Sequence, residues 1–163
     1  MSAGGEVGVA GDEELFASLY PKLRRFAAVV APAEMDPDDL VQEAAVRVLR
    51  FGRLDELRDP AAYLRTVMVR LAANERRRLG RWRRAFRRAT DTDRDDARYP
   101  SDLADLQRLS VETRAVLFLA VVEGWSYAEI GRRLGCREAT ARARASRGLR
   151  RLRRELSGEA QDA

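Results

Sequence analysis

Apolar residues recur at three- and four-residue steps along most of this 163-residue chain, and this spacing limits the possible folds more than any other feature. Such a stripe covers one face of an α-helix, because the helix completes a turn about every 3.6 residues. The first stripe consists of Leu15, Phe16, Leu19, Leu23, Phe26, Ala27 and Val30. Similar stripes follow within residues 40–49, 64–71, 111–122 and 141–156. The pattern predicts an all-α protein.

Capping residues mark where several of these helices begin. Asp36-Pro37 and Asp59-Pro60 each place a capping side chain before a proline in the first helical turn, which favours a helix start. Ser110 can cap the next helix, and Ser126 with Glu129 has the spacing of a capping box. These signals predict helix starts at about residues 37, 60, 111 and 127.

Other segments lack the helical pattern. Four glycines in the first eleven residues predict a flexible tail over 1–11, with the fold beginning near Asp12. Pro21 interrupts the first stripe, so that helix either kinks there or ends and is followed by a second one. Residues 89–105 are acidic and aperiodic, which predicts a flexible linker, and residues 158–163 are expected to form a C-terminal tail.

The composition favours two small domains. The chain is 45% hydrophobic and 35% charged, which is enough apolar material for helical cores but too much charge for one thick interior. We therefore expect two small helical domains, 12–88 and 106–157, joined by the flexible linker.

Several function classes are disfavoured by missing residue types. The chain has no His and a single Cys, Cys136, which removes the common zinc ligand sets, Cys/His nucleophile pairs and any intrachain disulfide. We expect no catalytic residue, no metal and no cofactor. The N-terminus lacks the basic and apolar pattern of a leader, and no apolar run is long enough to cross a membrane. The protein is therefore expected to be cytoplasmic, without membrane insertion.

Two basic blocks account for the net charge of +5. Residues 61–90 and residues 132–154 each carry ten basic groups and one acidic group, whereas the rest of the chain is acidic. Such blocks are typical of proteins that bind a polyanion such as nucleic acid. All basic residues but Lys22 are arginine. We attribute this bias to a GC-rich genome more readily than to a need for guanidinium contacts.

The second basic block lies in a predicted helix-turn-helix. A short helix from Tyr127 to Leu134 is followed by a turn at Gly135 and a longer helix over 138–156. That longer helix keeps every arginine outside one apolar seam, which consists of Ala141, Ala145, Leu149, Leu152 and Leu156. In a helix-turn-helix the second helix enters the DNA major groove. The alternative is that these arginines only solvate a surface helix.

The first basic block combines arginines with aromatic rings. Trp82 and Phe86 lie among its arginines. A basic groove with stacking groups is what single-stranded nucleic acid needs. The alternative is an ordinary amphipathic helix end with Trp82 in the core.

Three segments resemble regions of a known protein family, and they follow one another along the chain in the order that this family has. The sequence LSVETRAVLFLAVVEGWSYAEIGRRLGCREATARARASRGLRRLRREL resembles region 4 of extracytoplasmic-function (ECF) sigma factors of the sigma-70 family, which binds the minus-35 promoter element. DPDDLVQEAAVRVLR resembles the region 2 helix that docks on the clamp of the largest polymerase subunit. DPAAYLRTVMVRLAANERRR resembles the segment that opens and reads the minus-10 element.

The resemblance implies a sigma factor that binds core RNA polymerase through its beta and beta-prime subunits. It would direct transcription to promoters with minus-35 and minus-10 elements, help to open the DNA, and catalyse nothing itself. Sigma factors of this group often have an anti-sigma factor as a partner. The arginine bias suggests a GC-rich actinobacterium as the source.

The resemblance also implies roles for individual residues. The candidates for core polymerase binding are Asp38, Asp39, Leu40, Gln42 and Glu43. The candidates for minus-10 DNA are Tyr63, Arg65, Arg70, Asn74, Arg76 and Arg77. The candidates for minus-35 DNA are Tyr127, Arg137, Thr140, Arg142, Arg144, Ser146 and Arg147. Arg70 departs from the family pattern, because Asn usually stands there, and Asn74 lies one turn further along.

Two other functions compete with this interpretation. A stand-alone DNA-binding regulator would use the helix-turn-helix alone, and would leave the first domain without a role. A nucleic-acid-processing enzyme would need a cluster of acids or ligands beside the basic blocks to hold a metal, and the sequence has none.

Overall fold

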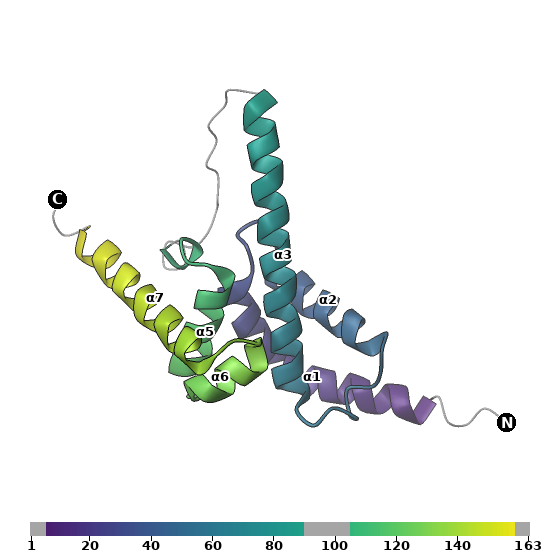
Figure 1. Cartoon of the computed structure of the whole chain (residues 1–163). Coiled ribbons are helices and arrows are strands. Elements are labelled where there is room, and N and C mark those ends of the chain that lie inside the picture. Colours follow the sequence, from purple (N-terminus) through teal and green to yellow (C-terminus); the bar gives the residue numbers. More distant parts are fainter. Residues whose placement is uncertain (1–5, 90–104, 159–163) are drawn as a thin grey trace.

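A computed structural model of the protein describes residues 6–89 and 105–158, and every regular element within them is an α-helix. In chain order these are α1 (Glu6–Val30), α2 (Pro37–Leu49), α3 (Pro60–Ala89), α5 (Val111–Val121), α6 (Tyr127–Leu134) and α7 (Glu138–Gly158) (Figure 1). The all-α prediction is confirmed. None of the helices in the described ranges combines the length and apolar character needed to cross a membrane.

Helix α1 begins earlier than the sequence predicts. It starts at Glu6, so the predicted tail over 1–11 is wrong for residues 6–11, and residues 1–5 lie outside the described part of the chain. Gly8 and Gly11, two of the glycines that suggested a tail, are tolerated in this helix at a cost of about 1 kcal/mol each. Pro21 lies inside α1, which continues through it to Val30 as one helix.

The next two helices start at their predicted capping residues. The Asp36 side chain accepts a hydrogen bond from the backbone N–H of Asp38 at 2.7 Å, ahead of α2. Asp59 accepts one from the N–H of Ala62 at 3.0 Å, ahead of α3. Helices α1, α2 and α3 contact one another around fully buried side chains, which include Leu23, Phe26, Leu40, Leu64 and Met68. The C-terminal half of α3 extends beyond this bundle (Figure 1).

The predicted helix-turn-helix is formed by α6 and α7. Ser126 caps α6 by accepting a hydrogen bond from the N–H of Glu129 at 3.2 Å, and Gly135 turns the chain in the left-handed conformation, with φ of 70°. Gly131 is required for close packing, because a Cβ there would lie 2.6 Å from the carbonyl oxygen of Cys136. In the seam of α7, Ala141 is fully buried.

The two predicted domains pack against each other. Helix α5, which Ser110 caps as predicted, contacts α1 and α3, and the buried residues of both parts form one continuous core. Phe26 of α1 and Phe118 of α5 meet edge to face, with ring centroids 5.3 Å apart. The fully buried Arg114 donates a hydrogen bond at 3.1 Å to the carbonyl oxygen of Ala31.

The predicted linker and tail fall mostly outside the described residues. Helix α3 reaches Ala89, residues 90–104 are not described, and residues 105–107 form a helical turn. Helix α7 ends at Gly158, and residues 159–163 are not described.

Candidate nucleic-acid interface

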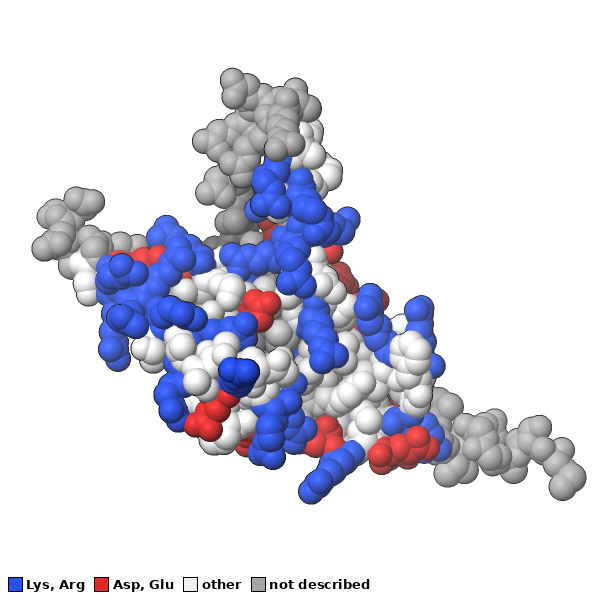
Figure 2. Space-filling model, in the orientation of Figure 1, with Lys and Arg blue, Asp and Glu red and all other residues white. Residues whose placement is uncertain are grey.

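Basic side chains gather over two helices. Figure 2 shows Lys and Arg side chains over the projecting half of α3 and along α7, which are the helices of the two basic blocks. The long, planar guanidinium group suits phosphate and base-edge contacts alike.

On the helix-turn-helix, the predicted minus-35 residues fall into two groups. Arg137, Arg142, Ser146 and Arg147 are exposed on α7 or just before it, where they are accessible to DNA. Tyr127, Thr140 and Arg144 are half-buried. The guanidinium of Arg142 lies over the ring of Tyr127, 5.7 Å from its centroid, and also pairs with Glu138. Tyr127 therefore helps to orient one of the exposed arginines.

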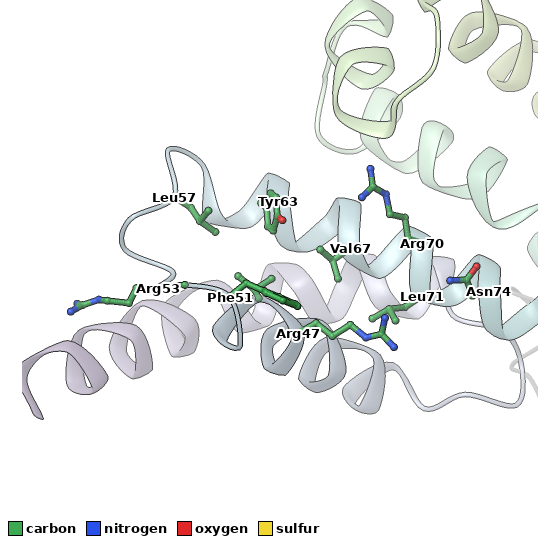
Figure 3. A pocket seen from close by; sticks show the side chains of 11 residues that line it. Arg47, Phe51, Arg53, Leu57, Tyr63, Val67, Arg70, Leu71 and Asn74 are labelled. Atoms are coloured by element: carbon green, nitrogen blue, oxygen red, sulfur yellow. The ribbon is translucent and has the colours of Figure 1, made fainter. Parts of the chain in front are cut away.

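A cavity of about 290 Å³ lies between the C-terminal end of α2, the following loop and the N-terminal half of α3 (Figure 3). This size is at the lower end of the range for small-ligand pockets, about 300–1,000 Å³. Two exposed aromatic residues line this cavity: Phe51, which is 92% exposed, and Tyr63, which is 50% exposed. Its lining residues are Arg47, Val48, Phe51, Gly52, Arg53, Leu57, Tyr63, Val67, Arg70, Leu71 and Asn74. We call this space the α2–α3 cavity.

Three of the predicted minus-10 residues, Tyr63, Arg70 and Asn74, line the α2–α3 cavity together. Arg77, one turn beyond, is exposed and donates a hydrogen bond to the side-chain oxygen of Asn74 at 2.6 Å. Figure 3 shows Tyr63 and Asn74 along α3, across from Arg47 and Phe51, and shows the guanidinium of Arg70 directed away from those two residues.

The other two predicted minus-10 residues point to the opposite side of α3. Arg65 is only 4% exposed, pairs with Glu123 at 3.1 Å, and lies between the rings of Phe26 and Trp125. Arg76 donates hydrogen bonds to the carbonyl oxygens of Leu109 and Gln107. In this arrangement both arginines hold α5 and its preceding turn against α3, so neither is presented to DNA.

Sequence reasoning missed Arg47, Phe51 and Arg53 as members of the cavity. Phe51 follows the buried stripe of α2 directly, and it is a large apolar residue placed outside that stripe. The signal available in the sequence was an aromatic residue beside Gly52, just past the end of the helical stripe.

The predicted polymerase-binding residues lie along α2. Asp39, Gln42 and Glu43 are exposed and line a groove between α2 and the middle of α3. Asp38 is held by α1, because it accepts hydrogen bonds from the Tyr20 hydroxyl and from Arg24 Nε, the latter at 2.8 Å.

The bond from Tyr20, aided by Arg24, lowers the pKa of the Asp38 carboxyl from 3.8. Leu40 is fully buried, so its side chain supports α2 from inside and is not available to a partner.

Within the described residues, no group of three or more Cys, Asp or Glu side chains is placed to hold a metal ion. The fold and these surfaces define a helical DNA-binding protein with a helix-turn-helix and a second basic region beside a small cavity.

Comparison with known proteins identifies the family. Residues 15–89 match the family model "Sigma-70 region 2", and residues 106–152 match "Sigma-70, region 4". The RNA polymerase sigma factor CarQ of Myxococcus xanthus is 33% identical over 160 residues, which cover 90% of this chain and 89% of CarQ. The ECF sigma factor SigE of Mycolicibacterium smegmatis is 30% identical over 168 residues, covering 96% of this chain and 65% of SigE.

A solved structure shares the fold. It is the sigma factor RpoE in complex with the anti-sigma factor NepR from Bartonella quintana, with a TM-score of 0.59 and 24% identity, covering 89% of this chain and 96% of that chain.

The chain belongs to the sigma-70 family of RNA polymerase sigma factors, as a member of its ECF group. Sigma factors bind core RNA polymerase and promoter DNA, and they direct transcription initiation without being enzymes themselves. The protein is therefore a promoter-directing initiation factor.

Proposed function

We propose that this sigma factor reads a two-part promoter with two separate surfaces. Helices α6 and α7 bind the minus-35 element as duplex DNA, and the α2–α3 cavity holds an unstacked base of the minus-10 element. The observation that carries the proposal is the cavity itself, in which two exposed aromatic rings and several arginines surround a space of about 290 Å³. Aromatic stacking with nearby cations is the usual means of holding an extruded base.

The minus-35 part of the proposal is supported by the exposed arginines on α7. Arg137 and Arg142 lie near the leading end of the helix, where major-groove base edges are reached. Arg150, Arg151 and Arg153 are exposed further along and suit phosphate contacts, which fix the register without reading sequence.

Arg65 and Arg76 remain candidates for minus-10 DNA under one condition. Arg65 is covered by Phe26 and by Glu123 and Trp125 after α5, and Arg76 bonds to the turn before α5, so both can reach DNA only after region 4 separates from α3. Tyr63, Arg70 and Asn74 need no such rearrangement, since they line the cavity and are not covered by α5.

The exposed side chains of Asp39, Gln42 and Glu43 would dock on the beta-prime clamp of core polymerase. An anti-sigma partner, a cytoplasmic location and an origin in a GC-rich actinobacterium complete the proposal. The arginine bias and the relative from Mycolicibacterium smegmatis support that origin, whereas CarQ comes from Myxococcus.

The test uses polymerase reconstituted with this protein and fluorescent single-stranded oligonucleotides that carry the minus-10 element. We expect Phe51→Ala and Tyr63→Ala to weaken binding by about 1–3 kcal/mol each, which is the usual contribution of one base–aromatic stack. Arg50→Ala is the matched control, because Arg50 is exposed beside Phe51 but does not line the cavity. Equal affinities for wild-type protein and both aromatic variants would rule out base binding in the cavity.

A further inference from the structure

One wall of the α2–α3 cavity is a loop, and this loop is tied to the N-terminal part of α1 by Asp12. The loop follows α2 and leads to α3, and its residues Gly52, Arg53 and Leu57 line the cavity. Asp12 is 42 residues earlier in the chain than Leu54, yet its Oδ1 accepts hydrogen bonds from the backbone N–H of Leu54 at 3.0 Å and of Asp55 at 3.2 Å.

This contact is built into the core and not formed at the surface. Asp12 is only 9% exposed, and the Leu54 side chain beside it is fully buried. A buried backbone N–H needs a hydrogen-bond acceptor, and bonds to a carboxylate are among the stronger ones. Asp12 therefore fixes the middle of the loop.

The two residues that Asp12 holds, Leu54 and Asp55, are next to loop residues that line the cavity. Asp55 also pairs with Arg53, whose Nε lies 2.9 Å from Asp55 Oδ1. The N–H of Leu57 donates to the carbonyl oxygen of Leu54 at 3.2 Å, which closes a turn. A shift of Leu54 and Asp55 would thus move Arg53 on one side and Leu57 on the other, and both line the cavity.

We propose that Asp12 is a positioning residue for base recognition, because it sets the distance between the loop wall and the rings of Phe51 and Tyr63. This proposal rests on the proposed function of the cavity. Asp12 touches no base itself. It acts through the backbone of Leu54 and Asp55.

Both hydrogen bonds go to the same oxygen, which provides a precise set of variants. Asp12→Asn keeps a carbonyl oxygen in place and should preserve both bonds, whereas Asp12→Ala removes them. Asp12→Glu keeps the charge but carries the acceptor one methylene further, which displaces the loop without emptying the site. Glu13→Ala is the charge control, because Glu13 is the exposed neighbour on α1.

The two hydrogen bonds to Asp12 are tested without DNA, by amide hydrogen exchange at Leu54 and Asp55 in the full-length protein. Exchange should be about tenfold faster in Asp12→Ala, in keeping with the loss of a hydrogen-bond acceptor, affected much less in Asp12→Asn, which keeps a neutral acceptor, and unchanged in Glu13→Ala. Unchanged exchange in Asp12→Ala would overturn the proposal at its first step.

Base recognition is measured with the reconstituted polymerase and four minus-10 oligonucleotides that differ only at the base expected in the cavity. Wild type, Asp12→Asn and Glu13→Ala should share one order of preference. Asp12→Ala should lose about tenfold of its discrimination, roughly the worth of a single misplaced contact. If Asp12→Ala fails to fold, Asp12→Glu serves as the test variant. It should change the order in which the protein prefers the four bases.

The outcomes separate the two proposals. If wild type discriminates and both Asp12→Ala and Asp12→Glu discriminate equally well, Asp12 is not a positioning residue and the function of the cavity stands. If wild type shows no preference among the four bases, the cavity does not read the base, and both proposals fail.

Discussion

Asp38 links the first two helices through its side chain. It lies at the start of α2 and accepts hydrogen bonds from Tyr20 and Arg24, both on α1. These contacts favour the charged carboxylate, and the pKa of Asp38 is lowered from 3.8, chiefly by the Tyr20 hydroxyl. Because the pKa is lower in the folded state, the contacts stabilise the fold above pH 3.8, and this stabilisation is lost as the pH falls through the lowered value.

Replacing Tyr20 with Phe should therefore raise the pKa of Asp38 toward 3.8 and move acid unfolding to higher pH. The carboxyl titration is followed by NMR, and unfolding by circular dichroism. Tyr63→Phe is the control, since the described contacts of Asp38 do not include Tyr63. An unchanged titration of Asp38 in Tyr20→Phe would show that the hydroxyl does not stabilise the carboxylate.

At the residue scale, the sequence predicted some placements and missed others for physical reasons. Tyr63, Arg70 and Asn74 share one face of a helix by spacing alone, so their meeting at the cavity follows from helical geometry. Arg65 and Arg76 lie on the other face of the same helix, where Phe26, Glu123 and Trp125 cover Arg65, and the turn before α5 half-buries Arg76. Helical spacing shows that these two groups of residues lie on different faces of α3. It does not show which other segments pack on the face of Arg65 and Arg76.

At the scale of elements, local signals were sufficient where the bond partners are close in sequence. Asp36, Ser110 and Ser126 each accept the predicted hydrogen bond from an N–H two or three residues later. The start of α1 was missed, because the composition of residues 6–11 suggests a tail. Asp12 anchors this part of α1 to Leu54 and Asp55, and a contact across 42 residues has no local signal.

Two glycines inside helices should respond in opposite directions to Ala. Gly131→Ala should destabilise the protein by about 1–3 kcal/mol, because the added Cβ would lie 2.6 Å from a backbone oxygen. Gly80→Ala should stabilise it by about 0.5–1 kcal/mol, because the Cβ meets no atom within 4 Å and Ala favours the helix. Urea unfolding measures both variants. A stabilising Gly131→Ala would contradict the described packing of α6, and a destabilising Gly80→Ala would contradict the open space at Gly80 in α3.

For the whole molecule, the two sigma regions share one core. Helix α3 lies between the two regions, since it contacts α1 and α2 of the first region and α5 and α6 of the second. The sequence predicted two separate domains because high charge disfavours a thick interior. Both domains are present, as regions 2 and 4. What the sequence did not predict is that they pack together, with the charged pair of Arg65 and Glu123 inside their contact.

This shared core predicts energetic coupling between the two regions. In a double-mutant cycle of Phe26→Leu and Phe118→Leu, the coupling free energy should be about 0.5–1.5 kcal/mol, the usual value for an aromatic pair in contact. The free energies come from urea unfolding of the full-length protein. Additive effects would mean that the two regions are not packed together in solution.

The most direct test of the sigma assignment and its promoter reading is transcription in vitro. Purified core polymerase is supplied with a library of genomic promoters, with and without this protein, and RNA start sites are sequenced. We expect new start sites that share a two-part upstream motif and that disappear when Arg137 and Arg142 are replaced by Ala. No new start sites, together with base-specific binding of duplex DNA by the protein alone, would contradict this account and favour a stand-alone regulator.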